Sequence, residues 1–140
     1  MNESTMTIFV CVSCRRPLGD SDDAFDLPGP ELAETLHTRL QKGGHGHIVV
    51  AQVDCLAVCK RPCTVALAAA DKWTYLIGDL DPKSHVDEVI AAALSFVASE
   101  NGIVPWRERP ASFRKGVIAR IPPITVKGGP QISFPEPVES

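Results

Sequence analysis

Five cysteines fall into two groups along the chain, and thiolates in such groups can bind metals or exchange electrons. Cys11 and Cys14 form the first group, and Cys55, Cys59 and Cys63 form the second. The N-terminal sequence MNESTMTIFVC has no basic region of a secretory signal, so we expect a cytoplasmic protein. In that compartment, grouped cysteines are more often metal ligands or redox groups than structural disulfides.

Each group of cysteines follows a short apolar segment that is typical of a β-strand. Residues 6–12 (MTIFVCV) end with Cys11 and Val12 and lead to Cys14, and residues 47–53 (HIVVAQV) lead to Cys55. If the two strands are neighbours in one sheet, their ends bring the two cysteine loops together. Four thiolates, two from each group, then converge at one edge of the sheet. Such a set binds either a 2Fe-2S cluster or a structural zinc ion.

The remaining pattern predicts a small α/β fold with a mixed sheet. Residues 15–28 are rich in turn formers and acids, which predicts a loop. A leucine every four residues, from Leu32 to Leu40, predicts a helix over residues 30–41. Further strands are expected over residues 64–69, 73–77 and 117–121, the first two joined as a hairpin, and a second helix capped by Ser84 is expected to end near residue 101.

The composition limits the classes of partner that we expect and suggests how the chain divides into domains. The 140 residues carry a net charge of −3, which gives no indication of a nucleic-acid partner. No apolar stretch approaches the roughly 20 residues that span a bilayer, so no membrane partner is expected. We expect residues 1–100 to form the domain that binds the metal or cluster. Residues 101–140 hold seven of the twelve prolines and are expected to be an extension packed on that domain, with a loosely ordered tail.

Four segments resemble known proteins, namely VCVSCRR, DCLAVCKRPCTVAL, KWTYLIGDLDP and PWRERP. They make the chain similar to thioredoxin-like 2Fe-2S ferredoxins and, more narrowly, to a bacterial family of predicted metal-binding proteins with a domain of unknown function. The resemblance covers roughly residues 8–123. It implies a thioredoxin-like two-layer sandwich, in which two helices cover a mixed sheet of four to five strands.

The same resemblance implies a set of ligands. Cys55 and Cys59 correspond directly to the C-x3-C motif of those ferredoxins, and Cys11 with Cys14 is the implied partner pair. Cys63 is an additional thiol, which is either a non-ligating neighbour or a substitute for Cys14 as the fourth ligand. Nearby cations at Arg15, Arg16, Lys60 and Arg61 are expected to stabilise the reduced, more negative form of a cluster, unless they simply face solvent.

By this resemblance the protein would be a ferredoxin-like carrier of single electrons or a redox sensor, and not an enzyme. An alternative is a zinc- or cobalt-binding delivery protein, because the family is associated with cobalamin and cobalt metabolism. A second alternative is a thiol–disulfide protein that uses Cys11 and Cys14. The sequence does not name the redox partner protein.

Charge is distributed unevenly along the chain. Residues 20–34 hold six acids and no base, whereas residues 101–127 hold six bases and one acid. Thioredoxin-like ferredoxins commonly pair, so a homodimer is a further hypothesis, with acidic residues 20–26 facing basic residues 107–120. Trp106 is expected to be a packed aromatic residue with the guanidinium groups of Arg107 and Arg109 at the surface.

Overall fold

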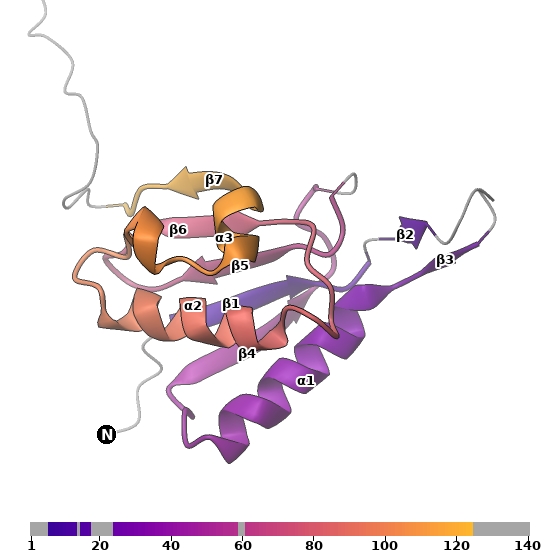
Figure 1. The fold of residues 1–140 in the computed structure, drawn as a ribbon, viewed down its shortest axis with the longest axis horizontal. Coiled ribbons are helices and arrows are strands. Elements are labelled where there is room, and N and C mark those ends of the chain that lie inside the picture. Colours follow the sequence, from indigo (N-terminus) through magenta and orange to yellow (C-terminus); the bar gives the residue numbers. More distant parts are fainter. Residues whose placement is uncertain (1–5, 14, 18–23, 59–60, 125–140) are drawn as a thin grey trace, which may run out of the picture.

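The computed structural model describes residues 6–13, 15–17, 24–58 and 61–124 (Figure 1). Its elements are, in chain order, β1 (Met6–Cys11), β2 (Arg16–Pro17), β3 (Phe25–Asp26), α1 (Pro28–Lys42), β4 (Ile48–Val53), β5 (Val65–Ala68), β6 (Thr74–Ile77), α2 (Val86–Ala98), η1 (Trp106–Glu108), α3 (Ala111–Lys115) and β7 (Val117–Ile121). Cys14, Cys59 and the C-terminal tail expected after Lys127 lie outside the described residues.

Five of these strands form one mixed sheet in the order β4-β1-β5-β6-β7. β1 and β4 are parallel, and the other neighbouring pairs are antiparallel. The parallel pair requires a crossover connection, which α1 supplies. Figure 1 shows α1 and α2 lying together on one face of the sheet. The predicted two-layer α/β sandwich with a mixed sheet is therefore confirmed, and a third, five-residue helix α3 joins it.

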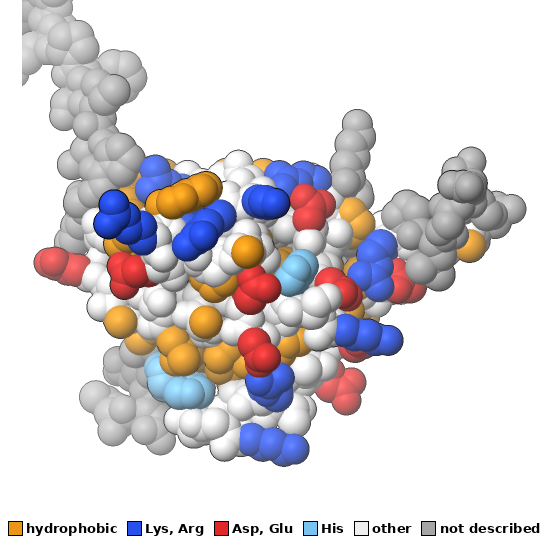
Figure 2. Space-filling view, viewed as in Figure 1, with side chains coloured by type: hydrophobic (Ala, Val, Ile, Leu, Met, Phe, Trp, Pro, Cys, Tyr) orange, Lys and Arg blue, Asp and Glu red, His pale blue; other side chains and the backbone are white. Residues whose placement is uncertain are grey.

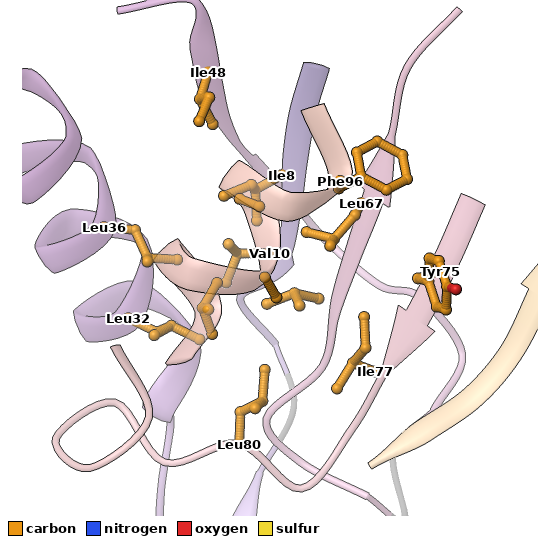
Figure 3. Packing of buried hydrophobic residues seen from close by; sticks show 14 of the residues in the cluster. Ile8, Val10, Leu32, Leu36, Ile48, Leu67, Tyr75, Ile77, Leu80 and Phe96 are labelled. Atoms are coloured by element: carbon orange, nitrogen blue, oxygen red, sulfur yellow. The ribbon is translucent and has the colours of Figure 1, made fainter. Parts of the chain in front are cut away.

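The hydrophobic core lies between the sheet and the two long helices (Figure 3). Alternation along β1 turns Ile8 and Val10 toward the helices, and both are fully buried. Leu32 and Leu36 from the predicted stripe of α1 meet them, and Phe96 covers the other end from α2. Burying each such side chain contributes about 1.5–3 kcal/mol relative to leaving it exposed. This core fixes how the ends of β1 and β4 lie relative to each other.

The start of α2 differs from the prediction. The helix begins at Val86 after His85 as N-cap residue, and no side chain caps it. Ser84 belongs to the preceding turn, which the amide of His85 closes by donating to the carbonyl of Asp81 over 3.1 Å. The Ser84 hydroxyl donates to the Asp81 carboxylate instead of to the helix. The prediction that Ser84 caps the helix is therefore wrong.

The segment expected as a loop over residues 15–28 contains a small ladder. β2 and β3 pair antiparallel, with Arg16 opposite Asp26. The Arg16 guanidinium makes an ion pair of 2.6 Å with Asp26 and reaches Asp81 at 3.3 Å. One arginine thus connects this ladder to the turn before α2.

The C-terminal extension adds a strand to the sheet and side chains to the core. β7 pairs with β6, and Val104 and Phe113 are buried in the core. The buried hydroxyl of Tyr75 accepts hydrogen bonds from the Val104 amide at 3.0 Å and from Arg109 at 3.2 Å. Residues 101–121 therefore contribute to the same sheet and core as the residues before them. The division of the chain into two parts at residue 100 stays a prediction. Within the described residues, no helix is long and apolar enough to cross a membrane.

Gly29, in the first turn of α1, lies against the end of β1 so closely that a side chain does not fit. A Cβ atom there would stand 2.0 Å from the carbonyl oxygen of Cys11 and 2.8 Å from the Cα of Val12. Both neighbours are backbone atoms, which cannot rotate away. We therefore expect Gly29→Ala to lower the free energy of unfolding by about 3 kcal/mol, measured by urea denaturation.

Gly46→Ala is the matched control. A Cβ atom at Gly46 would meet no atom within 4 Å, so this variant should unfold at nearly the wild-type urea concentration. Equal midpoints for the two variants would show that α1 does not pack on β1 as described.

Candidate functional site

The parallel pairing of β1 and β4 brings two of the predicted ligands to one edge of the sheet. Parallel strands end on the same side, and Cys11, the last residue of β1, lies opposite Val53, the last residue of β4. The ladder continues one step further, because the Val12 amide donates to the Val53 carbonyl over 3.0 Å. Cys55 follows Val53 by two residues. The paired strand ends therefore bring the segments that carry Cys11 and Cys55 to one edge of the sheet, while the convergence of the thiolates stays a prediction.

Cys11 is buried and held by backbone on two sides. Its amide donates to the carbonyl of Thr64 over 3.0 Å, and its thiol lies 3.9 Å from the carbonyl oxygen of Asp54. The hydroxyl of Ser13 donates to the same Asp54 carbonyl. One carbonyl group thus joins the two cysteine-bearing segments. No sequence pattern indicates this contact, because any residue at position 54 offers the same carbonyl.

Cys55 has the opposite environment, since its side chain faces solvent. The amide of Ala57 donates to the Cys55 sulfur over 3.1 Å. Ala57 has a φ of 61°, a left-handed conformation that turns the chain back toward the sulfur. Amide hydrogen bonds to cysteine sulfur are one means by which proteins set the reduction potential of iron–sulfur clusters. The loop after β4 is therefore shaped around the sulfur of Cys55.

Cys63 lies in the core just before β5. It is fully buried, and its amide and carbonyl form a pair of hydrogen bonds with Leu80 at 3.3 and 3.0 Å. Burial, together with the nearby Cys11 thiol, raises the pKa of the Cys63 thiol to about 12. Cys63 is therefore a neutral thiol at neutral pH.

The complete set of four cysteine ligands stays a prediction. Cys14 and Cys59 lie outside the described residues, so their positions relative to Cys11 and Cys55 are not given. Within residues 6–13, 15–17, 24–58 and 61–124, no three metal-ligating side chains lie together. The choice between Cys14 and Cys63 as fourth ligand also stays open.

The cations beside the cysteines are largely engaged with other groups. Arg16 binds Asp26 and Asp81, and Arg61 makes an ion pair of 2.7 Å with Asp79. The guanidinium of Arg15 stacks 4.6 Å from the ring centre of Phe25. Lys60 lies outside the described residues. Partnered cations act more weakly on a distant charge, so Arg16 and Arg61 contribute less to a cluster than isolated cations would.

A positive group that the sequence analysis missed is the N-terminus of α1. Its first turn packs on the backbone of Cys11 through Gly29. The amide groups at a helix N-terminus carry partial positive charge, which favours negative charge nearby. The sequence signal was present in Pro28-Gly29-Pro30, where proline at the start of a helix and a residue without a side chain occur together.

The sequence and the fold were compared with known proteins. A family model described as "Protein of unknown function (DUF1636)" matches residues 8–123. A search of curated proteins found no match. A solved structure of a thioredoxin-like [2Fe-2S] ferredoxin from Aquifex aeolicus is similar with a TM-score of 0.55 and 18% identity, over 89% of this chain and 99% of that one.

A second structure, the wild-type thioredoxin-like [2Fe-2S] ferredoxin from Aquifex aeolicus at 1.5 Å resolution, gives a TM-score of 0.52 at 18% identity. That match covers 83% of this chain and 98% of the other. At this identity the likeness concerns the fold alone. The predicted thioredoxin-like fold is therefore confirmed.

The different environments of Cys55 and Cys63 predict different reactivity in the metal-free native protein. The exposed Cys55 should react readily with iodoacetamide at pH 8. Raising a thiol pKa from 9.0 to about 12 reduces the thiolate about 1000-fold at that pH, and burial blocks access as well. We expect Cys63 to react at least about 100-fold more slowly than Cys55, measured by mass spectrometry of peptides.

The control is the same reaction in guanidinium chloride, where both cysteines should react at similar rates. If Cys63 reacted as fast as Cys55 in the native protein, its placement in the core would be wrong.

Proposed function

The chain belongs to the DUF1636 family of proteins of unknown function, and we propose that it is a ferredoxin-like protein that binds a 2Fe-2S cluster and carries single electrons. The ligands in this proposal are Cys11, Cys14, Cys55 and Cys59. The observation that supports it most is the in-register parallel pairing of β1 and β4, which brings Cys11 and Cys55 to one edge of the sheet. The two solved structures described above, which are similar in fold, are themselves thioredoxin-like [2Fe-2S] ferredoxins.

The described residues are suited to such a cluster. Thiolate is the donor that iron–sulfur clusters require, and two thiolates come from adjacent strand ends. The amide of Ala57 donates to the sulfur of Cys55, and the first turn of α1 lies against Cys11 with its partial positive charge. The amide hydrogen bond stabilises negative charge at the sulfur of Cys55, and the first turn of α1 contacts the backbone of Cys11.

The two described ligands have separate roles in the proposed site. Cys11 anchors it to the sheet, because the residue is fully buried and its amide is bound to Thr64. Cys55 forms the outer side, because it faces solvent. A bound cluster supplies reversible one-electron chemistry. A site that is anchored on one side and exposed on the other leaves the sulfur of Cys55 accessible to a partner protein.

The ligand assignment predicts the effect of two substitutions. Cys55→Ser and Cys59→Ser should each abolish stable cluster binding, because serine oxygen is a poor ligand for a soft metal site. Iron and acid-labile sulfide per chain, measured after purification without oxygen, should fall to background in both variants. Thr38→Ala is a control at an exposed position of α1 that removes a hydroxyl and no thiol. Full iron content in either serine variant would refute the assignment.

A second pair of variants tests the fourth ligand. In this proposal Cys11, Cys14, Cys55 and Cys59 supply the four thiolates, and Cys63 is a buried, non-ligating neighbour in the core. Cys63→Ala should therefore keep the iron content and the visible spectrum nearly unchanged, while Cys14→Ala should degrade both. The opposite result, with the cofactor lost in Cys63→Ala and kept in Cys14→Ala, would assign Cys63 as the ligand.

A further inference from the structure

Trp106 is a large aromatic side chain that the fold holds in place while leaving it exposed to solvent. Trp106 is the first residue of η1 and is 58% exposed. The expectation that it packs against the rest of the protein is therefore wrong. The Arg109 guanidinium lies 5.6 Å from the centre of its ring. Arg114 donates to the carbonyl of Trp106 at 3.2 Å and to that of Arg107 at 3.1 Å. A fixed and exposed tryptophan loses little conformational entropy when a partner covers it.

The support for this position extends into the core. Arg109 donates to the carbonyl of Val104 at 2.8 Å and to the hydroxyl of Tyr75 at 3.2 Å. Its guanidinium also lies 5.3 Å from the centre of the Tyr75 ring. Tyr75 is 2% exposed. Arg109 therefore lies between the exposed ring of Trp106 and the buried ring of Tyr75 and contacts both.

Cations surround this tryptophan. Residues 105–121 contain five bases and one acid. Arg107, Arg114 and Lys115 are exposed, and Figure 2 shows blue side chains gathered over α3 and β7 along the upper edge of the molecule. We call Trp106, Arg107, Arg114 and Lys115 the basic face. A positive face of this kind attracts negatively charged partners and accelerates their association.

The basic face reaches the segment that carries the cysteines. The Arg61 guanidinium donates to the carbonyl of Lys115 at 3.5 Å, and the amide of Gly78 donates to the carbonyl of Gly116 at 2.9 Å. Arg61 follows Cys59 by two residues in the sequence. A protein bound to the basic face would therefore extend toward the cysteine edge of the sheet.

We propose that the basic face is the docking surface for an acidic electron-transfer protein. Tryptophan and arginine are the residues most enriched among those that dominate binding energy at interfaces, and the cations match a negative partner. That the partner exchanges electrons rests on the function proposed above; that it is acidic rests on the charges of this face. A second copy of the chain is a weaker occupant, because Asp26 in its acidic segment already binds Arg16 of the same chain.

The test uses a flavodoxin, a small acidic electron-transfer protein, as probe. Its dissociation constant for the purified full chain is measured by calorimetry at low salt, with and without the cluster. Trp106→Ala should weaken binding about 10- to 30-fold and Lys115→Glu about 10-fold. Lys42→Glu is matched to Lys115→Glu, because both lysines are exposed in the last turn of a helix and both changes alter the net charge equally. It should leave the dissociation constant nearly unchanged.

The outcomes separate this proposal from the cluster assignment. If the protein contains no iron when it is purified without oxygen, yet its binding depends on Trp106 and Lys115, the docking surface is supported and the electron-transfer function is contradicted. A cluster-containing protein that does not bind flavodoxin at low salt, or that loses binding equally in Lys42→Glu, overturns the docking surface and leaves the cluster assignment standing. If sedimentation shows that the chain self-associates and Lys115→Glu abolishes this, the occupant is a second copy and the proposal is wrong.

Discussion

The rest of the structure depends on the parallel pairing of β1 with β4 beneath α1. The pairing is in register from Met6 opposite Ile48 to Cys11 opposite Val53, so the two strands end together. The leucine stripe of α1 covers the pair, and Gly29 allows the first turn of that helix to touch the backbone of Cys11. A shift of one residue in β4 would turn its side chains to the opposite face and move Cys55 away from Cys11.

Around this edge of the sheet, side chains of the same type have different roles because their environments differ. Cys55 faces solvent and accepts an amide hydrogen bond, whereas Cys63 is a core residue with a raised thiol pKa. The arginines near the edge bind carboxylates, which ties the β2–β3 ladder and the loop after β6 to the rest of the fold. Exposed ion pairs of this kind contribute little to stability, so their main effect is to position the segments on either side of the cysteines.

Much of the fold could be predicted from the sequence because the long elements have clear periodicity. The leucine stripe gave α1 to within two residues, and the apolar segments gave the five strands of the main sheet. The two-residue strands β2 and β3 and the five-residue helix α3 are too short for a periodic pattern, and they form through tertiary contacts such as Arg16 with Asp26. Ser84 had the side chain of a helix cap, but Asp81 accepts its hydroxyl instead.

The segments that meet at the site could be predicted from the sequence, but the burial of their individual side chains could not. Strand patterns placed Cys11 and Cys55 at neighbouring strand ends, but burial, which separates Cys63 from Cys55, is set by the packing of β5 and the loop before α2. Trp106 was expected to pack, but it is exposed, and Arg109 is the residue that packs on the ring of Tyr75. Aromatic residues are buried in most contexts, so sequence alone favoured the wrong environment.

The most direct test of the central claim is electron paramagnetic resonance of the wild-type protein, purified without oxygen and reduced by one electron, together with its metal and sulfide content. The account predicts a red-brown protein with about two irons and two sulfides per chain. The reduced protein should give the signal of a single unpaired electron. A colourless protein with one zinc ion per chain and no such signal would contradict it.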